Sequence, residues 1–204
     1  MSGLELAGVA LPRMEIVSPA TPMDVGDLTF SSYLSHSSLI SIFSRSIFDR
    51  MAARVSAEAA RMPTRRNIYV WRADTRARVM RNEDELVERL VQRLGVQPVV
   101  LSTLTLDEQI LLFKGAQVVI GPHGAGLANI VFCRPNTVLY ELIPHHYINP
   151  VVNHLAQLRG MHYWCDVHRA ETRPDLWRHQ TPWTVDIEAV ERRVEEILSF
   201  HRLS

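Results

Sequence analysis

The stretch from Gln117 to Leu127 reads QVVIGPHGAGL and joins a short apolar run directly to a glycine-rich segment. The run Gln117 to Ile120 predicts a buried strand of a parallel sheet, and residues 127–132 predict a helix. Glycine lacks a Cβ, which lets the backbone adopt positive φ and lets a ligand approach it closely. The turn between this strand and helix is expected to contain Gly121, Gly124 and Gly126.

A glycine-rich turn that opens into a helix is suited to binding an anion. Its backbone N–H groups can point at the ligand, and the helix start adds partial positive charge. We therefore expect a phosphate here. The alternative is a tight structural turn with a packing histidine, because a lone glycine-rich pattern is a weak signal. The imidazole of His123 can contact the ligand, hydrogen-bond the loop or transfer a proton, and we expect ligand contact first.

Strand and helix patterns alternate along the rest of the chain. Strands are expected at 67–71, 98–102, 117–120, 138–142 and 162–165. Helices are expected at 83–94, 106–113, 127–132, 150–159 and 186–200. Thr105 and Glu108 form a capping-box pair before the second of these helices, and Gly160 ends the fourth. The alternation predicts a doubly wound, Rossmann-like α/β fold with one parallel sheet covered on both faces.

The sequence changes character near Pro63. Residues 1–62 are rich in Ser, Ala and Pro and show no complete core pattern. One helix is expected there, at 38–61, because apolar residues recur at helical spacing. We therefore divide the chain into an N-terminal segment, 1–62, and a Rossmann-like domain, 63–204.

Polar residues follow each expected strand, and in open α/β sheets ligands bind outside the carboxyl ends of the strands. The planar fork of arginine matches phosphate oxygens, so arginines after the first strand suit a diphosphate beside the glycine turn. A solvated arginine loop is the alternative. These arginines are Arg72, Arg76 and Arg78.

Glu141 lies near the end of an otherwise apolar strand, where a carboxylate is unfavourable without a partner. A ribose diol or a neighbouring arginine would satisfy it. No metal site is expected, because His145, His146 and His168 lack HExxH or another ligand spacing. No GxSxG nucleophile motif occurs either.

Composition limits the function classes. The 204 residues are 47% hydrophobic with zero formal net charge, which predicts a soluble globular protein and no broad nucleic-acid surface. Cys133 and Cys165 have no CxxC spacing, which predicts reduced thiols in the cytoplasm. We expect no export signal and no membrane span.

Several segments together resemble the carboxy-terminal half of family 61 glycosyltransferases, over about Arg66 to Pro144. They are RNIYVWRADTRARVMRNEDEL, LTLDEQILLFKGAQVVIGPHGAGLANIVFC and TVLYELIP. The first-strand arginine, the NEDEL helix start and the GPHGAGL turn carry the resemblance. One departure is Trp71, where the family commonly has a small serine.

The resemblance implies an inverting enzyme of the GT-B type, which moves a sugar from a nucleotide diphosphate donor to a glycan or other hydroxyl acceptor, as in polysaccharide biosynthesis. It implies no metal cofactor. It also implies that residues 1–62 are the remnant or hinge of the acceptor lobe, most of which is missing, so no general base is assigned. By resemblance the donor nucleotide would be lined by Arg72, His123, Gly124, Ala125, Gly126 and Glu141. A nucleotide-binding or regulatory module without transfer activity is the alternative.

Overall fold

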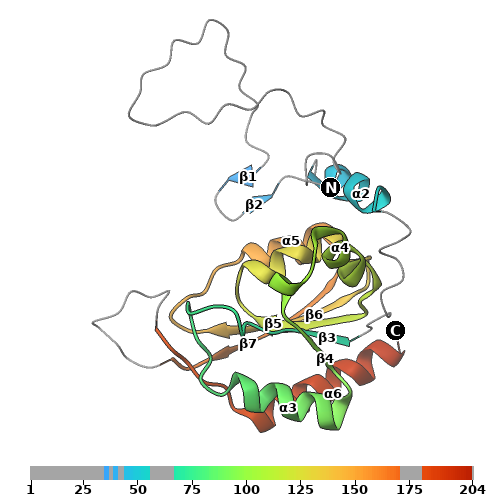
Figure 1. The fold of residues 1–204 in the computed structure, drawn as a ribbon. Helices are drawn as coiled ribbons and strands as arrows, with labels where there is room; N and C mark the ends of the chain where they lie inside the picture. The colour runs from blue at the N-terminus through green and yellow to red at the C-terminus, as the bar shows by residue number, and fades with distance from the viewer. Residues whose placement is uncertain (1–34, 37–38, 41–43, 56–66, 171–180, 204) are drawn as a thin grey trace, which may run out of the picture.

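The computed structural model describes residues 35–36, 39–40, 44–55, 67–170 and 181–203. Within them a five-stranded parallel sheet lies between two layers of helices (Figure 1). This confirms the doubly wound α/β fold. The strands are β3 (Asn67–Val70), β4 (Gln97–Val99), β5 (Val118–Pro122), β6 (Val138–Pro144) and β7 (His162–His168).

The order of the strands across the sheet is β4-β3-β5-β6-β7. The chain leaves β3 for β4 at one edge and then returns to β5 on the other side of β3. The direction of winding therefore reverses between β3 and β5. At such a switch point the loops after the two strands diverge to opposite faces and leave a crevice, which is where ligands bind in this class of fold.

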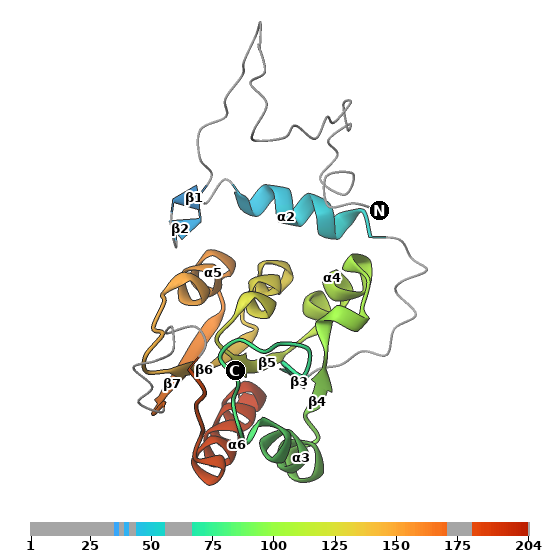
Figure 2. The same ribbon diagram turned by 60° about the vertical axis from the view of Figure 1, so that its left-hand side comes forward.

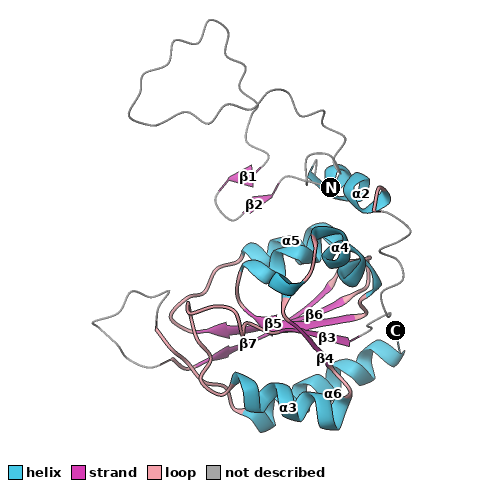
Figure 3. Ribbon diagram, viewed as in Figure 1, coloured by secondary structure: helices cyan, strands magenta, loops and turns pink. Residues whose placement is uncertain are grey.

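The helices divide between the two faces as the connections require (Figures 1 and 2). One face is covered by α3 (Glu83–Leu94) and α6 (Ile187–Leu203). The other is covered by α4 (Leu106–Gly115), the 3-10 helix η3 (Ala125–Phe132) and α5 (Val151–Arg159). A second 3-10 turn, η2 (Leu101–Thr103), follows β4, and Figure 3 separates helices, strands and loops by colour.

Alternation along the strands builds two cores. On β3, Ile68 and Val70 pack toward η3, α4 and α5, whereas Tyr69 packs toward α3 and α6. Every residue of the central strands β5 and β6 is buried, as expected for a parallel sheet with both faces covered. The apolar run that predicted a buried strand therefore lies at the centre of the molecule.

Most predicted elements are confirmed, and the differences are local. The helix at 83–94 has the predicted ends, the Thr105–Glu108 capping box is formed, and Gly160 caps α5 with φ of 67°. The predicted helix after β5 is instead a 3-10 helix that begins at Ala125, and Gly121 belongs to β5. The strand predicted at 98–102 ends at Val99, because the chain turns into η2.

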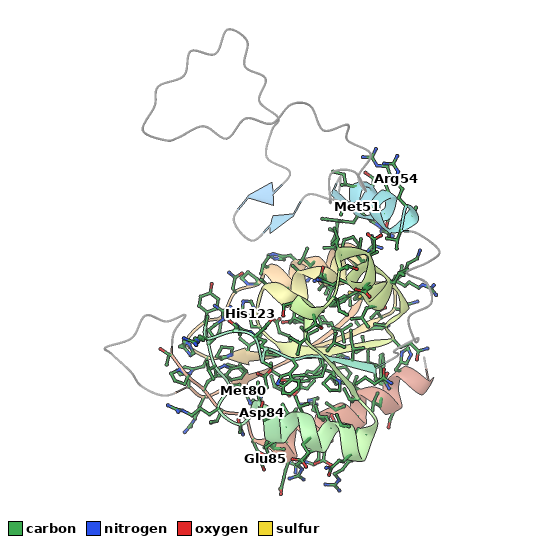
Figure 4. The ribbon with its side chains drawn as sticks, in the orientation of Figure 1. Met51, Arg54, Met80, Asp84, Glu85 and His123 are labelled. Carbon is green, nitrogen blue, oxygen red and sulfur yellow. The ribbon has the colours of Figure 1, made fainter. Side chains whose placement is uncertain are left out.

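The helix predicted at 38–61 is shorter within the described residues. Leu39–Ile40 (β2) pairs with Ser35–His36 (β1), and α2 spans Ser44–Ala53, while residues 56–61 lie outside the described part. The Phe48 ring of α2 meets the Phe132 ring edge-on, with centroids 5.9 Å apart. Thus α2 packs on the layer that contains η3, as Figure 4 shows with Met51 and Arg54 labelled. No helix in the described residues has the length and hydropathy needed to cross a bilayer.

Candidate functional site

A pocket of about 330 Å³ lies at the switch point between β3 and β5. Its walls come from the end of β3, the loop that follows it, η2 and the start of η3. Four of the residues predicted from the sequence therefore converge on one cavity: Arg72, Arg78, Ala125 and Gly126. Arg76 is exposed and does not line the pocket. His123 and Gly124, which follow β5, and Glu141 of β6 are not among the lining residues either.

Arg72 is one of the residues that line this pocket. Its Nη1 donates a hydrogen bond to the carbonyl oxygen of His123 at 3.1 Å, and its Nη2 donates to the carbonyl of Ala77 at 2.8 Å. These two bonds use two of the five N–H donors of the guanidinium group, which leaves three for other partners. Burial and the nearby charge of Arg78 lower the pKa of Arg72. Arg72 and Arg78 are therefore close enough to repel each other, and Asp74 lines the same pocket.

The glycines of the turn serve close packing and not an unusual backbone. A Cβ on Gly124 would lie 3.4 Å from Cζ of Arg72, and one on Gly126 would lie 3.0 Å from Cγ1 of Val70. The backbone of Gly124 is extended, with φ of 170°. Among the described glycines, left-handed φ is confined to Gly95 and Gly160, so the turn does not use the positive φ that glycine permits.

Arg78 is fixed at both ends. Its backbone adopts φ of 51°, an uncommon left-handed conformation for a residue with a side chain. Its carbonyl accepts a hydrogen bond of 2.8 Å from the indole Nε1 of the buried Trp183. Its guanidinium Cζ lies 4.6 Å from the centre of the Tyr147 ring, in a cation–π arrangement. These contacts hold a second arginine beside Arg72.

His123 and Glu141 form a buried pair behind the pocket. The Nδ1 of His123 lies 2.5 Å from Oε1 of Glu141, and the other carboxylate oxygen accepts a 2.6 Å hydrogen bond from the hydroxyl of Tyr163. Glu141 is fully buried, and its partners are a histidine and a tyrosine where the sequence suggested an arginine or a ribose. Burial, followed by the hydrogen bond and charge of Glu141, raises the pKa of Tyr163. Figure 4 labels His123 at this end of the sheet.

Two further side chains support the wall and were not predicted. The carboxylate of Glu83, the first residue of α3, accepts hydrogen bonds from the Tyr69 hydroxyl at 3.0 Å and from the backbone N–H of Arg72 at 3.3 Å. The NEDEL helix start carried a signal for Glu83. The sequence carried none for Trp183, which reaches the site from a loop more than 100 positions away in the chain.

His145 after β6 and Asp166 of β7 have structural partners. The Nδ1 of His145 accepts a hydrogen bond from the backbone N–H of Ala170, and Asp166 accepts one from the hydroxyl of Tyr140. In the described ranges, no three His, Cys, Asp or Glu side chains are grouped as a metal site would require.

Comparison with known proteins gives a consistent result. A family model described as glycosyltransferase 61 matches residues 10–140. The chain is 33% identical over 75 residues to a beta-1,2-xylosyltransferase of Arabidopsis thaliana, a match covering 37% of this chain and 14% of that protein. It is 28% identical over 158 residues to an EGF domain-specific O-linked N-acetylglucosamine transferase of Drosophila melanogaster, covering 72% of this chain and 29% of the relative.

The chain therefore spans less than a third of the length of either relative. The family match includes β3, the NEDEL helix start, the GPHGAGL turn and the first three residues of β6, and it ends just before Glu141. These segments carried the resemblance in the sequence, and the end of β3 and the glycine turn among them contribute residues to the pocket. Because the family model covers more than half of its residues, the chain belongs to glycosyltransferase family 61.

Proposed function

We propose that this chain holds the donor-binding lobe of an inverting, GT-B type glycosyltransferase. In this proposal the diphosphate of a nucleotide sugar binds in the switch-point pocket, and the sugar moves to a hydroxyl group of a glycan or similar acceptor. The observation that carries the proposal is the pair of arginines, Arg72 and Arg78, on one wall of a 330 Å³ cavity. A cavity of this volume is at the lower end of the range for small-molecule sites.

Two residues that line the same pocket have hydrogen-bond donors without partners, which supports the binding of a ligand rich in hydrogen-bond acceptors. Within the described part of the chain, the buried Nε of Arg78 and the buried indole Nε1 of Trp71 have no hydrogen-bond partner. Buried donors without partners are rare because each is costly to desolvate. Phosphate oxygens would accept hydrogen bonds from such donors and would also balance the charge of the two guanidinium groups.

The proposed chemical role of this lobe is electrostatic. When the bond between the anomeric carbon and the diphosphate breaks, negative charge grows on the leaving oxygen, and Arg72 and Arg78 would stabilise that charge. Two fixed arginines can supply the positive charge that a metal ion supplies in other enzymes, so we propose metal-independent binding. We propose that Glu141 contributes to the site by holding His123. One oxygen of its carboxylate already contacts His123, and the other accepts a hydrogen bond from Tyr163.

The general base is proposed to lie in an acceptor lobe that associates with this chain. Inverting transfer needs a base within hydrogen-bond reach of the acceptor hydroxyl, and positioning of that hydroxyl in line with the anomeric carbon. In the GT-B arrangement much of this comes from the second lobe. Hence the 204-residue chain is expected to bind donor but to transfer little sugar.

Two measurements test this proposal. Calorimetry in chelator with uridine and guanosine diphosphates should give binding to the isolated chain, and absence of heat or thermal shift at millimolar nucleotide would contradict donor binding. Release of nucleoside diphosphate from a panel of nucleotide sugars with glycan acceptors should be slow. Robust acceptor-dependent turnover would place the base within this chain, with Asp74, His145 and Asp166 the first residues to replace.

The second candidate function is a nucleotide-binding module without transfer activity, because the cavity lined by Arg72 and Arg78 would serve nucleotide binding in either case. The two functions separate when the chain is extended with the missing part of a family 61 enzyme. Restored turnover supports the transferase, and binding without turnover supports the module.

A further inference from the structure

Glu83 is a buried carboxylate that the α3 helix does not need for its own stability. Negative charge in the first turn of a helix is favourable, and α3 has three acidic residues there: Glu83, Asp84 and Glu85. Asp84 and Glu85 are exposed and already provide this charge, and Figure 4 shows Glu85 on the side of α3 away from the sheet. Only Glu83 turns inward, where its side chain is 7% exposed.

The position of Glu83 is unfavourable for a charged group. Burial raises the pKa of Glu83, and the hydrogen bonds from Tyr69 and Arg72 counter this only in part. Burial and the adjacent Glu83 carboxylate also raise the pKa of Tyr69. A carboxylate kept in the core against its desolvation energy is more common at functional sites than in purely structural ones.

One oxygen of the Glu83 carboxylate accepts hydrogen bonds from both Tyr69 and Arg72. Oε1 accepts the hydrogen bond from the backbone N–H of Arg72, at the residue where β3 gives way to the pocket loop. The Tyr69 hydroxyl donates to the same oxygen and fixes it from inside the sheet. From this anchored backbone the Arg72 side chain reaches the carbonyls of His123 and Ala77. A displacement of the Arg72 backbone would therefore move its guanidinium away from the pocket wall.

The charges of Arg78 and Glu83 also act on Arg72, in opposite directions. The positive charge of Arg78 disfavours the protonated form of Arg72, and the negative charge of Glu83 favours it. Glu83 thus offsets the repulsion between two guanidinium groups that share one wall before any anion is bound.

We propose that Glu83, held by Tyr69, is a positioning residue that sets Arg72 for the donor diphosphate. This inference rests on the proposed donor site. It assigns to Glu83 no contact with the substrate. The effect of Glu83 depends on the position of the carboxylate oxygen that accepts the Arg72 N–H. Its negative charge matters less, because a negative charge near an anion site would by itself weaken anion binding.

The test compares two conservative variants that separate position from charge. Glu83→Gln keeps the side-chain length and the acceptor oxygen and removes the charge. Glu83→Asp keeps the charge and withdraws the oxygen from the Arg72 N–H. Calorimetry of the full chain with uridine and guanosine diphosphates should give roughly tenfold weaker binding for the Asp variant, the loss expected when a hydrogen bond to a charged group is misaligned. The Gln variant should bind within about threefold of the parent.

Glu85→Asp is the matched control, since it makes the same change on the exposed side of the helix start. A purely structural role for Glu83 predicts that nucleotide affinity stays constant while thermal stability changes. Equal binding by parent and Asp variant, or loss in Gln alone, would overturn the proposal.

A second readout keeps this test apart from the donor-site proposal. The Nε–H resonance of Arg72 in nitrogen-15 spectra, assigned with Arg72→Lys, reports the placement of the side chain without any ligand. It should shift or broaden in the Asp variant and stay near the parent position in the Gln variant. If the parent binds neither nucleotide, the donor-site proposal fails. Independently of that result, an Arg72 resonance that is unchanged in the Asp variant would reject positioning of Arg72 by Glu83.

Discussion

Arg72 donates a hydrogen bond from Nη1 to the backbone carbonyl of His123 at 3.1 Å, and this bond joins the loop after β3 to the loop after β5. These are the two strands between which the chain reverses its winding direction. A Cβ on Gly124 would lie 3.4 Å from Cζ of Arg72, in van der Waals contact with the guanidinium group. One residue pair therefore connects the two sides of the crevice.

Substitution of the two glycines should separate binding from folding. Gly124→Ala places a methyl group 3.4 Å from Cζ of Arg72, so the variant should fold normally and bind nucleoside diphosphate more weakly. Gly126→Val introduces a branched side chain where even a Cβ lies 3.0 Å from Val70, and overpacking of this kind destabilises by about 1–3 kcal/mol. Urea unfolding and calorimetry measure the two effects. If both variants fold and bind as the parent does, the turn has only a structural role.

The pH dependence of stability should reveal the buried Glu83. Its pKa in the folded protein is raised above the ordinary value of 4.5, so the folded state retains the proton to higher pH than the unfolded state. The contribution of Glu83 to stability is thus fully present below pH 4.5 and is lost as pH rises through the raised pKa. Glu83→Gln does not titrate, so its stability relative to the parent should increase between pH 4 and pH 7.5 in urea unfolding. A constant or decreasing difference would contradict the raised pKa.

Arg159 should stabilise the chain mainly through its bonds to the Cys133 carbonyl and only weakly through its ion pair with α2. This buried side chain donates two hydrogen bonds to the carbonyl of Cys133, at 3.1 and 3.0 Å, and one to Asp49 of α2 at 2.7 Å. Arg159→Met should lower the free energy of unfolding by about 2–3 kcal/mol, because the Cys133 carbonyl loses charged donors. Asp49→Asn should lower it by less than about 1 kcal/mol, because Asp49 is half exposed. Equal losses in urea unfolding would show that the ion pair with α2 contributes as much as the bonds to Cys133.

The sequence predicted the fold well because the signals that determine it are local. The apolar runs of β5 and β6, the Thr105 capping box and the Gly160 cap each act within a few residues, and each is present in the structure. The boundaries near η2 and η3 were predicted less well, because these segments form 3-10 helices and a short apolar pattern does not distinguish them from other structure.

The site was predicted only in part because its partners come from distant segments. The rule that ligands bind beyond the carboxyl ends of strands brought Arg72, Arg78 and the glycine turn to one edge, and the pocket unites them. The sequence showed that the carboxylate of Glu141 needs a partner. That its partners are His123 and Tyr163 depends on the register of β5, β6 and β7. The role of Trp183 depends on a tertiary contact with no periodic pattern.

The two cysteines should differ sharply in reactivity. Cys165 is exposed on β7, whereas Cys133 is buried and burial raises the pKa of its thiol to about 12. Only thiolates react readily with disulfide reagents, so one thiol should be labelled in the native chain at pH 8 and two after unfolding. Mass spectrometry identifies the labelled residue. Rapid labelling of Cys133 in the native chain would mean that the packing of η3 opens easily.

The most direct measurement of the central claim compares nucleoside diphosphate binding by the parent, Arg72→Lys and Arg76→Lys in chelator. Lysine retains the charge but cannot bond two carbonyls and a phosphate from one planar fork, so Arg72→Lys should bind at least about tenfold more weakly. Arg76 is exposed outside the pocket, and its variant should bind as the parent does. Equal affinity in all three proteins, or a loss confined to Arg76→Lys, would contradict the placement of the donor diphosphate at the switch point between β3 and β5.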